Sequence, residues 1–302
     1  MKVIVLGKTG QVARALTAFF PDALFLDRNA LDLSRPKTIV PTLQKLKADC
    51  IINAAAYTAV DKAESESALA FAVNETAVAE LAKFTAANNI WFIHFSTDYV
   101  FSGTQVDPYK EQDQTAPTGV YGRSKLAGEQ AILEHCTRYL IFRTSWVFAE
   151  NCANFVSTML RLAKERDHLG VVNDQLGCPT YAGDIAMVTS VVVKRLALSE
   201  PGKNIKAGIY NLCCSGPVTW HAFAMEIFRR GLVTGVIDKI PEVIALTTAE
   251  YPTAAKRPAN SILDTKKLEE ALAFATATAI SMPHWSVGLQ KVLNAYQGAK
   301  RS

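Results

Sequence analysis

The chain has 302 residues, of which 49% are hydrophobic and 20% are charged, and its formal net charge is +4. This length suffices for one large domain or two smaller ones, and the composition is that of an ordinary globular protein. Basic and acidic residues alternate along the chain, and basic runs do not exceed a pair. Such mixing is typical of a solvated surface and predicts no binding of nucleic acid.

Targeting and metal-binding signals are also missing from the sequence. The chain enters a strand pattern at Lys2 without a basic leader, and no apolar stretch is long enough to cross a bilayer. The six cysteines form no C-x-x-C motif, and the five histidines do not cluster. We therefore expect a cytoplasmic protein with reduced cysteines, no membrane segment and no metal site.

The first half alternates short apolar runs with longer helical patterns. In chain order, the strands are expected at Lys2–Leu6, Ala23–Leu26, Cys50–Asn53, Trp91–Phe95 and Tyr139–Phe142, and the helices between them at Gln11–Phe20, Pro36–Lys47, Ser67–Asn88 and Val120–His135. Strand–helix alternation predicts an α/β fold with a doubly wound parallel sheet that is covered on both faces, as in Rossmann-type domains.

The second half is less regular. Helices are expected at Asn154–Glu165, Asp184–Leu198, Trp220–Arg230, Lys266–Leu272 and Pro283–Tyr296, and a strand at Gly208–Leu212 that takes in Cys213 and Cys214. Residues 241–258 are expected to be mostly loop because prolines interrupt them. We predict a first domain over residues 1–150, with residues 169–198 and 207–213 returning to it, and a smaller α/β substrate-binding domain over 151–302.

A glycine turn follows the first strand and opens the first helix. Its residues, Gly7 to Val12 with Ala13, follow a G-x-x-G-x-x-A pattern. Glycine lets the backbone approach a pyrophosphate closely, and a helix N-terminus offers free N–H groups to phosphates. The turn therefore predicts a dinucleotide site and makes the first domain an NAD(P)-binding domain. We expect contacts from Gly7, Thr9, Gly10, Gln11 and Val12.

The ends of the next two strands supply further candidates for the cofactor site. A carboxylate at Asp27 suits the ribose hydroxyls of NADH, whereas a guanidinium at Arg28 suits the 2′-phosphate of NADPH. The choice between the two cofactors therefore stays open. The other expected contacts are Asp32 and Leu33 near the adenine, and Ala54, Ala55, Ala56, Tyr57 and Thr58 after the third strand.

A Tyr121-Gly-Arg-Ser-Lys125 segment opens a helix after the Ser-Thr-Asp end of the fourth strand. Residues four apart share one face of a helix, so Tyr121 and Lys125 lie together. We expect the ammonium of Lys125 to lower the pKa of Tyr121, which would make the phenol an acid catalyst near neutral pH, and to bind the nicotinamide ribose. Together with Thr97, the pair predicts an oxidoreductase.

The motifs of the chain resemble the dTDP-4-dehydrorhamnose reductase family of the extended short-chain dehydrogenase/reductase superfamily. The resemblance covers nearly the whole chain in family order, through Gly7–Val12, Asn53–Glu64, Ser96–Phe101, Tyr121–Glu129, Arg143–Phe148, Asp174–Thr180 and Arg257–Ser261. It implies that NADPH or NADH reduces the C4 keto group of dTDP-4-dehydro-β-L-rhamnose. This is the last step of dTDP-L-rhamnose biosynthesis, which serves bacterial lipopolysaccharide and O-antigen.

The same resemblance implies roles for individual residues. Tyr121 would protonate the new alkoxide, Lys125 would orient the ribose and tune Tyr121, and Thr97 would hold the C4 oxygen. The resemblance also implies contacts of the substrate, a dTDP-4-dehydro-6-deoxy sugar, with Val60, Thr97, Asp98, Tyr121 and Trp146. Arg257 is expected at the diphosphate because arginine binds phosphate in bidentate fashion; core packing of Trp146 and a surface ion pair of Arg257 are the alternatives.

Some members of the family that this chain resembles carry a glutamate just after the glycine turn. In those proteins the glutamate takes part in a Mg²⁺-bridged dimer. This chain has Ala15 there, next to Arg14. Dependence on Mg²⁺ is therefore doubtful, and we predict a metal-independent monomer or weak homodimer.

Two other functions fit parts of the pattern. A sugar-nucleotide dehydratase or epimerase would share the fold, but the acid–base pair of a dehydratase is incomplete because Tyr99 follows Asp98. The second alternative is a regulatory, non-catalytic subunit, because the β subunit of methionine adenosyltransferase is similar in sequence to these reductases. The presence of Thr97, Tyr121 and Lys125 argues against a protein that has lost its chemistry.

Overall fold

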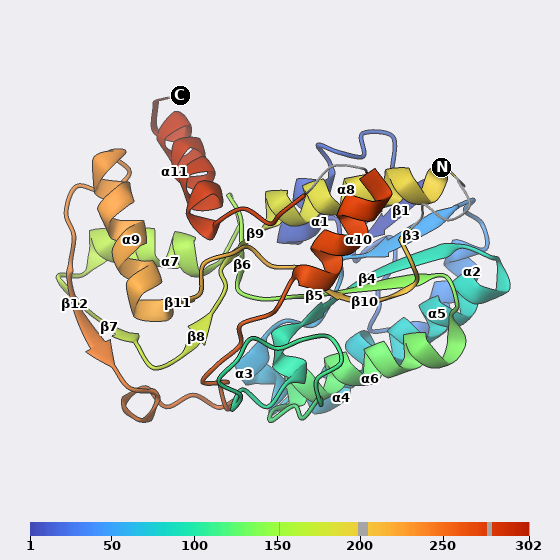
Figure 1. Ribbon diagram of the computed structural model, residues 1–302, viewed down its shortest axis with the longest axis horizontal. Coiled ribbons are helices and arrows are strands. Elements are labelled where there is room, and N and C mark those ends of the chain that lie inside the picture. The colour runs from blue at the N-terminus through green and yellow to red at the C-terminus, as the bar shows by residue number, and fades with distance from the viewer. Residues whose placement is uncertain (151, 199–204, 277–279, 302) are drawn as a thin grey trace.

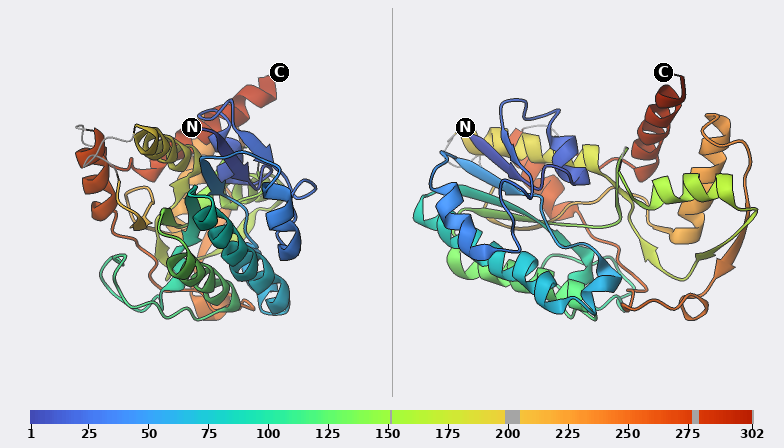
Figure 2. Two further views of the ribbon diagram at one scale, coloured as in Figure 1. Left: turned by 90° about the vertical axis from the view of Figure 1, so that its right-hand side faces the viewer. Right: turned by 180° about the vertical axis from the view of Figure 1, so that it is seen from behind.

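The computed structural model describes residues 1–150, 152–198, 205–276 and 280–301. Figure 1 shows two lobes, a larger one built around a sheet and a smaller one at the opposite end of the long axis. The N-terminus lies in the larger lobe and the C-terminal helix in the smaller one, as the view from behind in Figure 2 also shows.

A six-stranded parallel sheet, formed by the described residues, organises the larger lobe. Its order across the sheet is β10-β5-β4-β3-β1-β2. The strands are β1 (Val3–Leu6), β2 (Leu24–Leu26), β3 (Cys50–Asn53), β4 (Trp91–Thr97), β5 (Tyr139–Thr144) and β10 (Gly208–Asn211). Because the chain runs outward from β1 in both directions, the sheet is doubly wound, and the predicted fold class is confirmed.

Helices cover both faces of this sheet (Figure 1). One face carries α1 (Gln11–Leu16), α8 (Ala182–Ala197) and α10 (Lys266–Thr276), and the other carries α2 (Ile39–Leu43), α5 (Ala77–Ala87) and α6 (Val120–His135). Successive residues of β1 point to opposite faces, so that Val3 and Val5 join one apolar cluster and Ile4 and Leu6 join the other. This two-sided burial explains why the strands are apolar throughout.

The smaller lobe consists of short elements from the second half of the chain. They are β6 (Val147–Phe148), α7 (Phe155–Glu165), β7 (His168–Val172), β8 (Leu176–Gly177), β9 (Thr180–Tyr181), β11 (Val218–Thr219), α9 (Trp220–Val233), β12 (Glu242–Leu246), the 3₁₀ turn η4 (Thr248–Glu250) and α11 (Trp285–Arg301). The segments α8, β10 and α10 belong to the larger lobe, although they follow residue 150. The domain division remains a prediction, and its first C-terminal residue, 151, lies outside the described residues.

Two expectations about elements are wrong, and a third holds only in part. Residues 36–47 form a 3₁₀ turn, η1 (Pro36–Thr38), and the short α2 instead of one helix; Pro41 lies within α2 and has no N–H to bond back to Lys37, so the two turns do not join in one α-helix. Residues 241–258 are mostly loop as expected, but 242–246 form β12, which pairs in parallel with β7. Strand β10 ends at Asn211, so Cys213 and Cys214 follow the strand and are buried.

The long helix expected over residues 67–88 is present but interrupted. It consists of α4 (Ser67–Phe71), a π-helical turn η2 (Ala72–Thr76) and α5. A π turn inserts one extra residue and redirects its side chains, and such turns are frequent at functional sites. Here the turn contains the buried Asn74. The remaining short elements of this lobe are α3 (Val60–Ala63) and the 3₁₀ turn η3 (Asp98–Val100).

Candidate active site

The glycine turn lies where β1 meets α1. Gly7 has φ +88°, and a Cβ at this residue would lie 2.8 Å from the backbone nitrogen of Ala55. Only glycine combines this left-handed conformation with so close a neighbour. A hydrogen bond of 2.8 Å from Gly10 N–H to the Gly7 carbonyl closes the turn, and Gly10 precedes α1 without a side-chain cap. The turn thus has the open backbone that a pyrophosphate needs.

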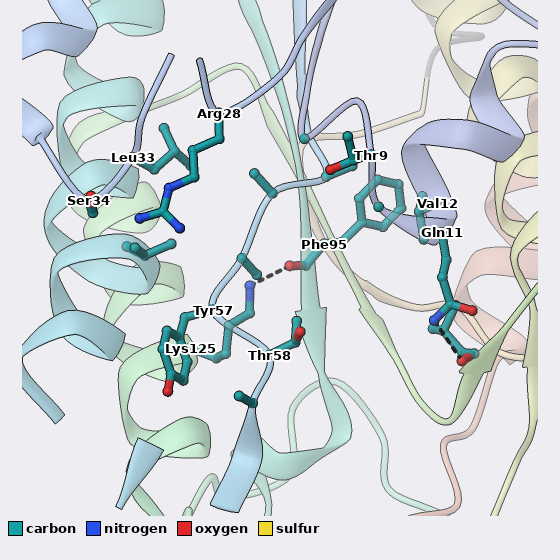
Figure 3. Close-up of a pocket in the computed structure, with 18 of the residues that line it drawn as sticks. Thr9, Gln11, Val12, Arg28, Leu33, Ser34, Tyr57, Thr58, Phe95 and Lys125 are labelled. Atoms are coloured by element: carbon teal, nitrogen blue, oxygen red, sulfur yellow. Dashed lines mark hydrogen bonds between the residues drawn. The ribbon is translucent and has the colours of Figure 1, made fainter. Parts of the chain in front are cut away.

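A cavity of about 890 Å³ extends from this turn along the carboxyl ends of the strands. It is lined by every residue that the sequence predicts for the cofactor: Gly7, Thr9, Gly10, Gln11, Val12, Asp27, Arg28, Asp32, Leu33, Ala54, Ala55, Ala56, Tyr57, Thr58, Tyr121 and Lys125. Its volume lies at the large end of the range for small-molecule and cofactor sites. Figure 3 shows Thr9 and Val12 on one side of it, with Arg28 and Leu33 opposite.

The charged groups at the end of β2 are held in defined positions. Asp27 Oδ1 accepts hydrogen bonds of 3.0 Å from the N–H groups of Asn29 and Ala30. Arg28 Nε lies 3.4 Å from Asp32 Oδ1, and its side chain remains largely exposed. A hydrogen bond from Ser34, followed by weaker effects that include Arg28, lowers the pKa of Asp32. The carboxylate of Asp27 and the guanidinium of Arg28 both line the same end of the cavity.

Tyr121 lines the cavity, and Thr97 and Asp98 are buried next to it, outside the lining. The Thr97 hydroxyl donates to Asp98 Oδ1 over 2.9 Å. Burial raises the pKa of Asp98 to about 6, while hydrogen bonds from Thr97 and Ser261 act in the opposite direction. Burial also raises the pKa of Tyr121 above its usual value, and only a hydrogen bond with Thr97 opposes the shift. Tyr121 therefore keeps its proton across the neutral range.

Lys125 is buried on the same helix as Tyr121, and its amine meets β4. Its Nζ donates to the Phe95 carbonyl over 2.7 Å, a bond drawn in Figure 3, and lies 3.1 Å from His94 Nε2. Burial lowers the pKa of Lys125 to about 8. The expectation that Lys125 lowers the pKa of Tyr121 is wrong in this structure, because burial of the phenol dominates its pKa.

The wall of the cavity is tied to the helix that carries Tyr121. Asn74 Oδ1 accepts from Tyr57 N–H, and Asn74 Nδ2 donates to the Tyr57 carbonyl and to the Ser124 hydroxyl, with distances of 2.9 to 3.0 Å. Asn74 owes this inward position to the π turn. Its role is structural, and it links the cofactor-facing segment at Tyr57 to α6.

The predicted substrate residues Val60, Arg257 and Trp146 do not line the cavity. Val60 and Arg257 lie near α3, and Trp146 lies in the smaller lobe. Arg257 pairs with Asp61 of α3 at 2.5 Å and donates to the Tyr99 hydroxyl at 3.1 Å, and the Tyr99 ring packs edge-on against Tyr121. Arg257 thus reaches the catalytic group, but its guanidinium is engaged by a carboxylate rather than free for a diphosphate. Val60 begins α3 next to this ion pair.

Trp146 belongs to the smaller lobe. It has φ +46°, unusual for a tryptophan, and its ring stacks on Trp220 with 3.4 Å between centroids. A Cβ at Gly177 would lie 2.4 Å from the Trp146 ring, so a glycine is required beneath it. The strained backbone and the half-buried ring fit a residue that is held in place to meet a ligand.

Sequence reasoning did not find several residues of the site, among them four buried polar ones. Ser96 and Thr144 line the cavity, and within the described residues their buried hydroxyl oxygens have no hydrogen-bond partner. Such atoms fit the carboxamide of a nicotinamide. Asn53 and His94 form the buried contacts behind Lys125. The only available signal was their position at the ends or inside of strands, next to the motifs.

The chain is similar to known proteins over nearly its whole length. A family profile described as the RmlD substrate binding domain matches residues 1–298. The chain is 44% identical to the dTDP-4-dehydrorhamnose reductases of Shigella flexneri and Escherichia coli K12, with 97% of each chain covered. It is 33% identical to the spore coat polysaccharide biosynthesis protein SpsK of Bacillus subtilis, over 97% of this chain and 96% of that protein.

Solved structures show the same fold. The dTDP-4-dehydrorhamnose reductase of Bacillus anthracis in complex with NADP superposes with a TM-score of 0.85 at 33% identity, covering 98% of this chain and all of that one. The UDP-glucose 4-epimerase of Thermus thermophilus, with a TM-score of 0.76 at 18% identity over 99% of this chain and all of that one, shows the shared fold alone. The chain therefore belongs to the dTDP-4-dehydrorhamnose reductase family, and the resemblance seen in its motifs is confirmed.

Proposed function

We propose that this protein reduces the C4 keto group of dTDP-4-dehydro-β-L-rhamnose to the alcohol with NAD(P)H, as the last step of dTDP-L-rhamnose biosynthesis. The observation that carries the proposal is the position of Tyr121, hydrogen-bonded to Thr97, in the lining of a cavity that begins at a dinucleotide-type glycine turn. The relatives named as reductases of this substrate support it.

When bound, the cofactor supplies the hydride. Tyr121 then protonates the oxygen, and its raised pKa suits this step because the phenol stays protonated until a far stronger base, the developing alkoxide, appears. The Thr97 hydroxyl donates its single hydrogen to Asp98 in this structure, and it would turn this hydrogen to the substrate oxygen beside Tyr121 when the substrate binds. Lys125 holds the nicotinamide ribose from the floor of the cavity.

The residues fit either dinucleotide, with a preference for NADPH. Arg28 projects along the cavity, and its side chain, which is exposed and paired with Asp32, can turn to a 2′-phosphate (Figure 3). The related Bacillus anthracis enzyme is described with NADP. Asp27 nonetheless stands where it could accept the ribose hydroxyls of NADH.

The sugar nucleotide is proposed to lie between the lobes, against Val60, Asp98, Trp146 and Arg257. Trp146 offers a ring face for the sugar, and the Arg257 guanidinium must exchange its partner Asp61 for an anionic ligand to reach the diphosphate. Within the described residues no group of three or more potential metal ligands occurs and no helix could cross a membrane. We propose a metal-independent cytoplasmic enzyme that acts as a monomer or weak homodimer and serves surface polysaccharide.

A direct test uses the substrate made in situ by the upstream dehydratase and epimerase, with NADPH consumption followed by absorbance. We expect turnover in the wild type and a loss of about 10²–10⁴-fold in Tyr121→Phe, because the proton donor is removed. Tyr251→Phe, an exposed tyrosine, is the matched control and should keep full activity. Sugar isomerisation without NADPH consumption would instead indicate an epimerase, and no reaction at all would favour a binding role.

A further inference from the structure

A buried chain of three polar side chains leads away from the cavity floor. It joins Asn53 at the end of β3, His94 in β4 and Lys125 on α6. The amide nitrogen of Asn53 lies 3.1 Å from His94 Nδ1, and His94 Nε2 lies 3.1 Å from Lys125 Nζ. Each of the three is at most 1% exposed, so their contacts must be satisfied within the chain.

The orientation of the Asn53 amide is fixed by the backbone. Its Oδ1 accepts a hydrogen bond of 3.1 Å from Ala55 N–H, which turns its nitrogen toward His94. An amide nitrogen can only donate, so His94 Nδ1 must accept. Burial lowers the pKa of His94, so the ring is neutral and carries its single hydrogen on Nε2.

Lys125 therefore faces an N–H donor. An ammonium group has three hydrogens and no lone pair, so it cannot accept this hydrogen and the two donors repel each other. A neutral amine accepts from His94 Nε2 and donates to the Phe95 carbonyl at 2.7 Å. One N–H of the amine is then left for the cavity that Lys125 lines.

We propose that His94, oriented by Asn53, is a positioning residue that presents an Nε2–H donor to Lys125 and stabilises the neutral amine of this lysine relative to its ammonium form. The consequence for catalysis rests on the proposed function, in which Lys125 holds the cofactor ribose. The arrangement makes the protonation of Lys125, and thus the number of hydrogens it can offer to the ribose, depend on the tautomer of His94, which is 31 residues away in sequence.

The other groups that face Lys125 do not reverse this effect. Glu129, one turn further along α6, raises the pKa of Lys125, but its carboxylate is held 2.6 Å from Arg143 of β5. Tyr121, one turn back along α6, is protonated and therefore neutral. Burial is the larger effect, and it brings the pKa of Lys125 to about 8. The His94 donor acts in the same direction.

The tautomer is directly measurable by NMR on full-length protein with ¹⁵N-labelled histidine. The signal of His94 is assigned by its loss in His94→Gln. We expect a neutral ring at pH 7 with a bare Nδ1 and a protonated Nε2. A hydrogen on Nδ1 would overturn the proposal. Because no substrate is present, this outcome says nothing against the reductase function.

Two variants separate the tautomer from simple charge. Asn53→Asp keeps an oxygen for Ala55 N–H but replaces the donor that faces His94 with an acceptor, so the ring should move its hydrogen to Nδ1 and accept from a Lys125 ammonium. His94→Gln adds no charge and lets an amide oxygen accept from the same ammonium. In both, we expect the Lys125 titration, followed by NMR of labelled lysine, to rise by about one pH unit.

The pH at which the reduction rate falls on the alkaline side should rise together with the titration of Lys125. This effect should appear in KM for the cofactor more than in kcat. His168→Gln, an exposed histidine on β7, is the matched control and should change neither titration nor rate. Circular dichroism and urea unfolding verify that each variant is folded. An unchanged or lowered Lys125 titration in both folded variants would refute the proposal.

Discussion

The contact between α6 and the π turn gives a prediction whose size follows from the structure. Gly128 of α6 lies against the Asn74 carbonyl, and a Cβ there would come within 2.1 Å of that oxygen. Real Cβ atoms essentially never approach closer than 3.0 Å, so Gly128→Ala must push α6 outward by about 1 Å. The backbone oxygen cannot turn aside, unlike the end of a flexible side chain.

The expected change in stability is the sum of two opposing effects. Alanine in place of a helical glycine stabilises a helix by about 1 kcal/mol. Overpacking against a rigid neighbour costs about 1–3 kcal/mol or more. We therefore expect Gly128→Ala to lower the free energy of unfolding by up to about 2 kcal/mol. Since α6 carries Tyr121 and Lys125, a shift of this size should also lower kcat by about 10²-fold.

Urea unfolding and steady-state NADPH oxidation measure the two effects separately. Gly298→Ala is the matched control, because this helical glycine has nothing within 4 Å of its Cβ position, and it should be neutral or more stable by up to about 1 kcal/mol. A Gly128→Ala protein with wild-type stability and wild-type kcat would show that the packing of α6 on Asn74 does not position the catalytic pair.

Three further predictions concern charge and assembly. Burial raises the pKa of Asp98 from 3.8 to about 6, so the contribution of this group to stability is greatest below pH 4 and is lost as the pH rises through 6. The stability of Asp98→Asn relative to wild type should therefore increase by about 2–3 kcal/mol between pH 4 and pH 7. Unfolding experiments at both pH values measure this difference. Arg28→Ala should weaken NADPH binding about 10–100-fold and NADH binding little, and equal losses in titrations of both would contradict the role of the guanidinium. Because Ala15 offers no metal ligand, sedimentation should give the same species with and without a chelator, and a chelator-sensitive dimer would disprove metal independence.

Much of the fold could be predicted from short-range patterns. The apolar runs located the five strands of the first half, and helix α6 begins at Val120 and ends at His135 as expected. The paired strands β7 and β12 were not both recognised, because a short parallel strand is stabilised by a partner about 70 residues away rather than by its own pattern. The π turn at Asn74 was not visible either, since helical periodicity tolerates one inserted residue.

The same distinction applies to the candidate site. By itself the sequence determined the glycine turn and the shared helical face of Tyr121 and Lys125, because both depend on the conformational limits of neighbouring residues. Only the tertiary structure decided the electrostatics. The direction in which the pKa of Tyr121 shifts depends on burial. The ring nitrogen that His94 presents to Lys125 depends on contacts between distant strands and helices. No local spacing in the sequence encodes either of these.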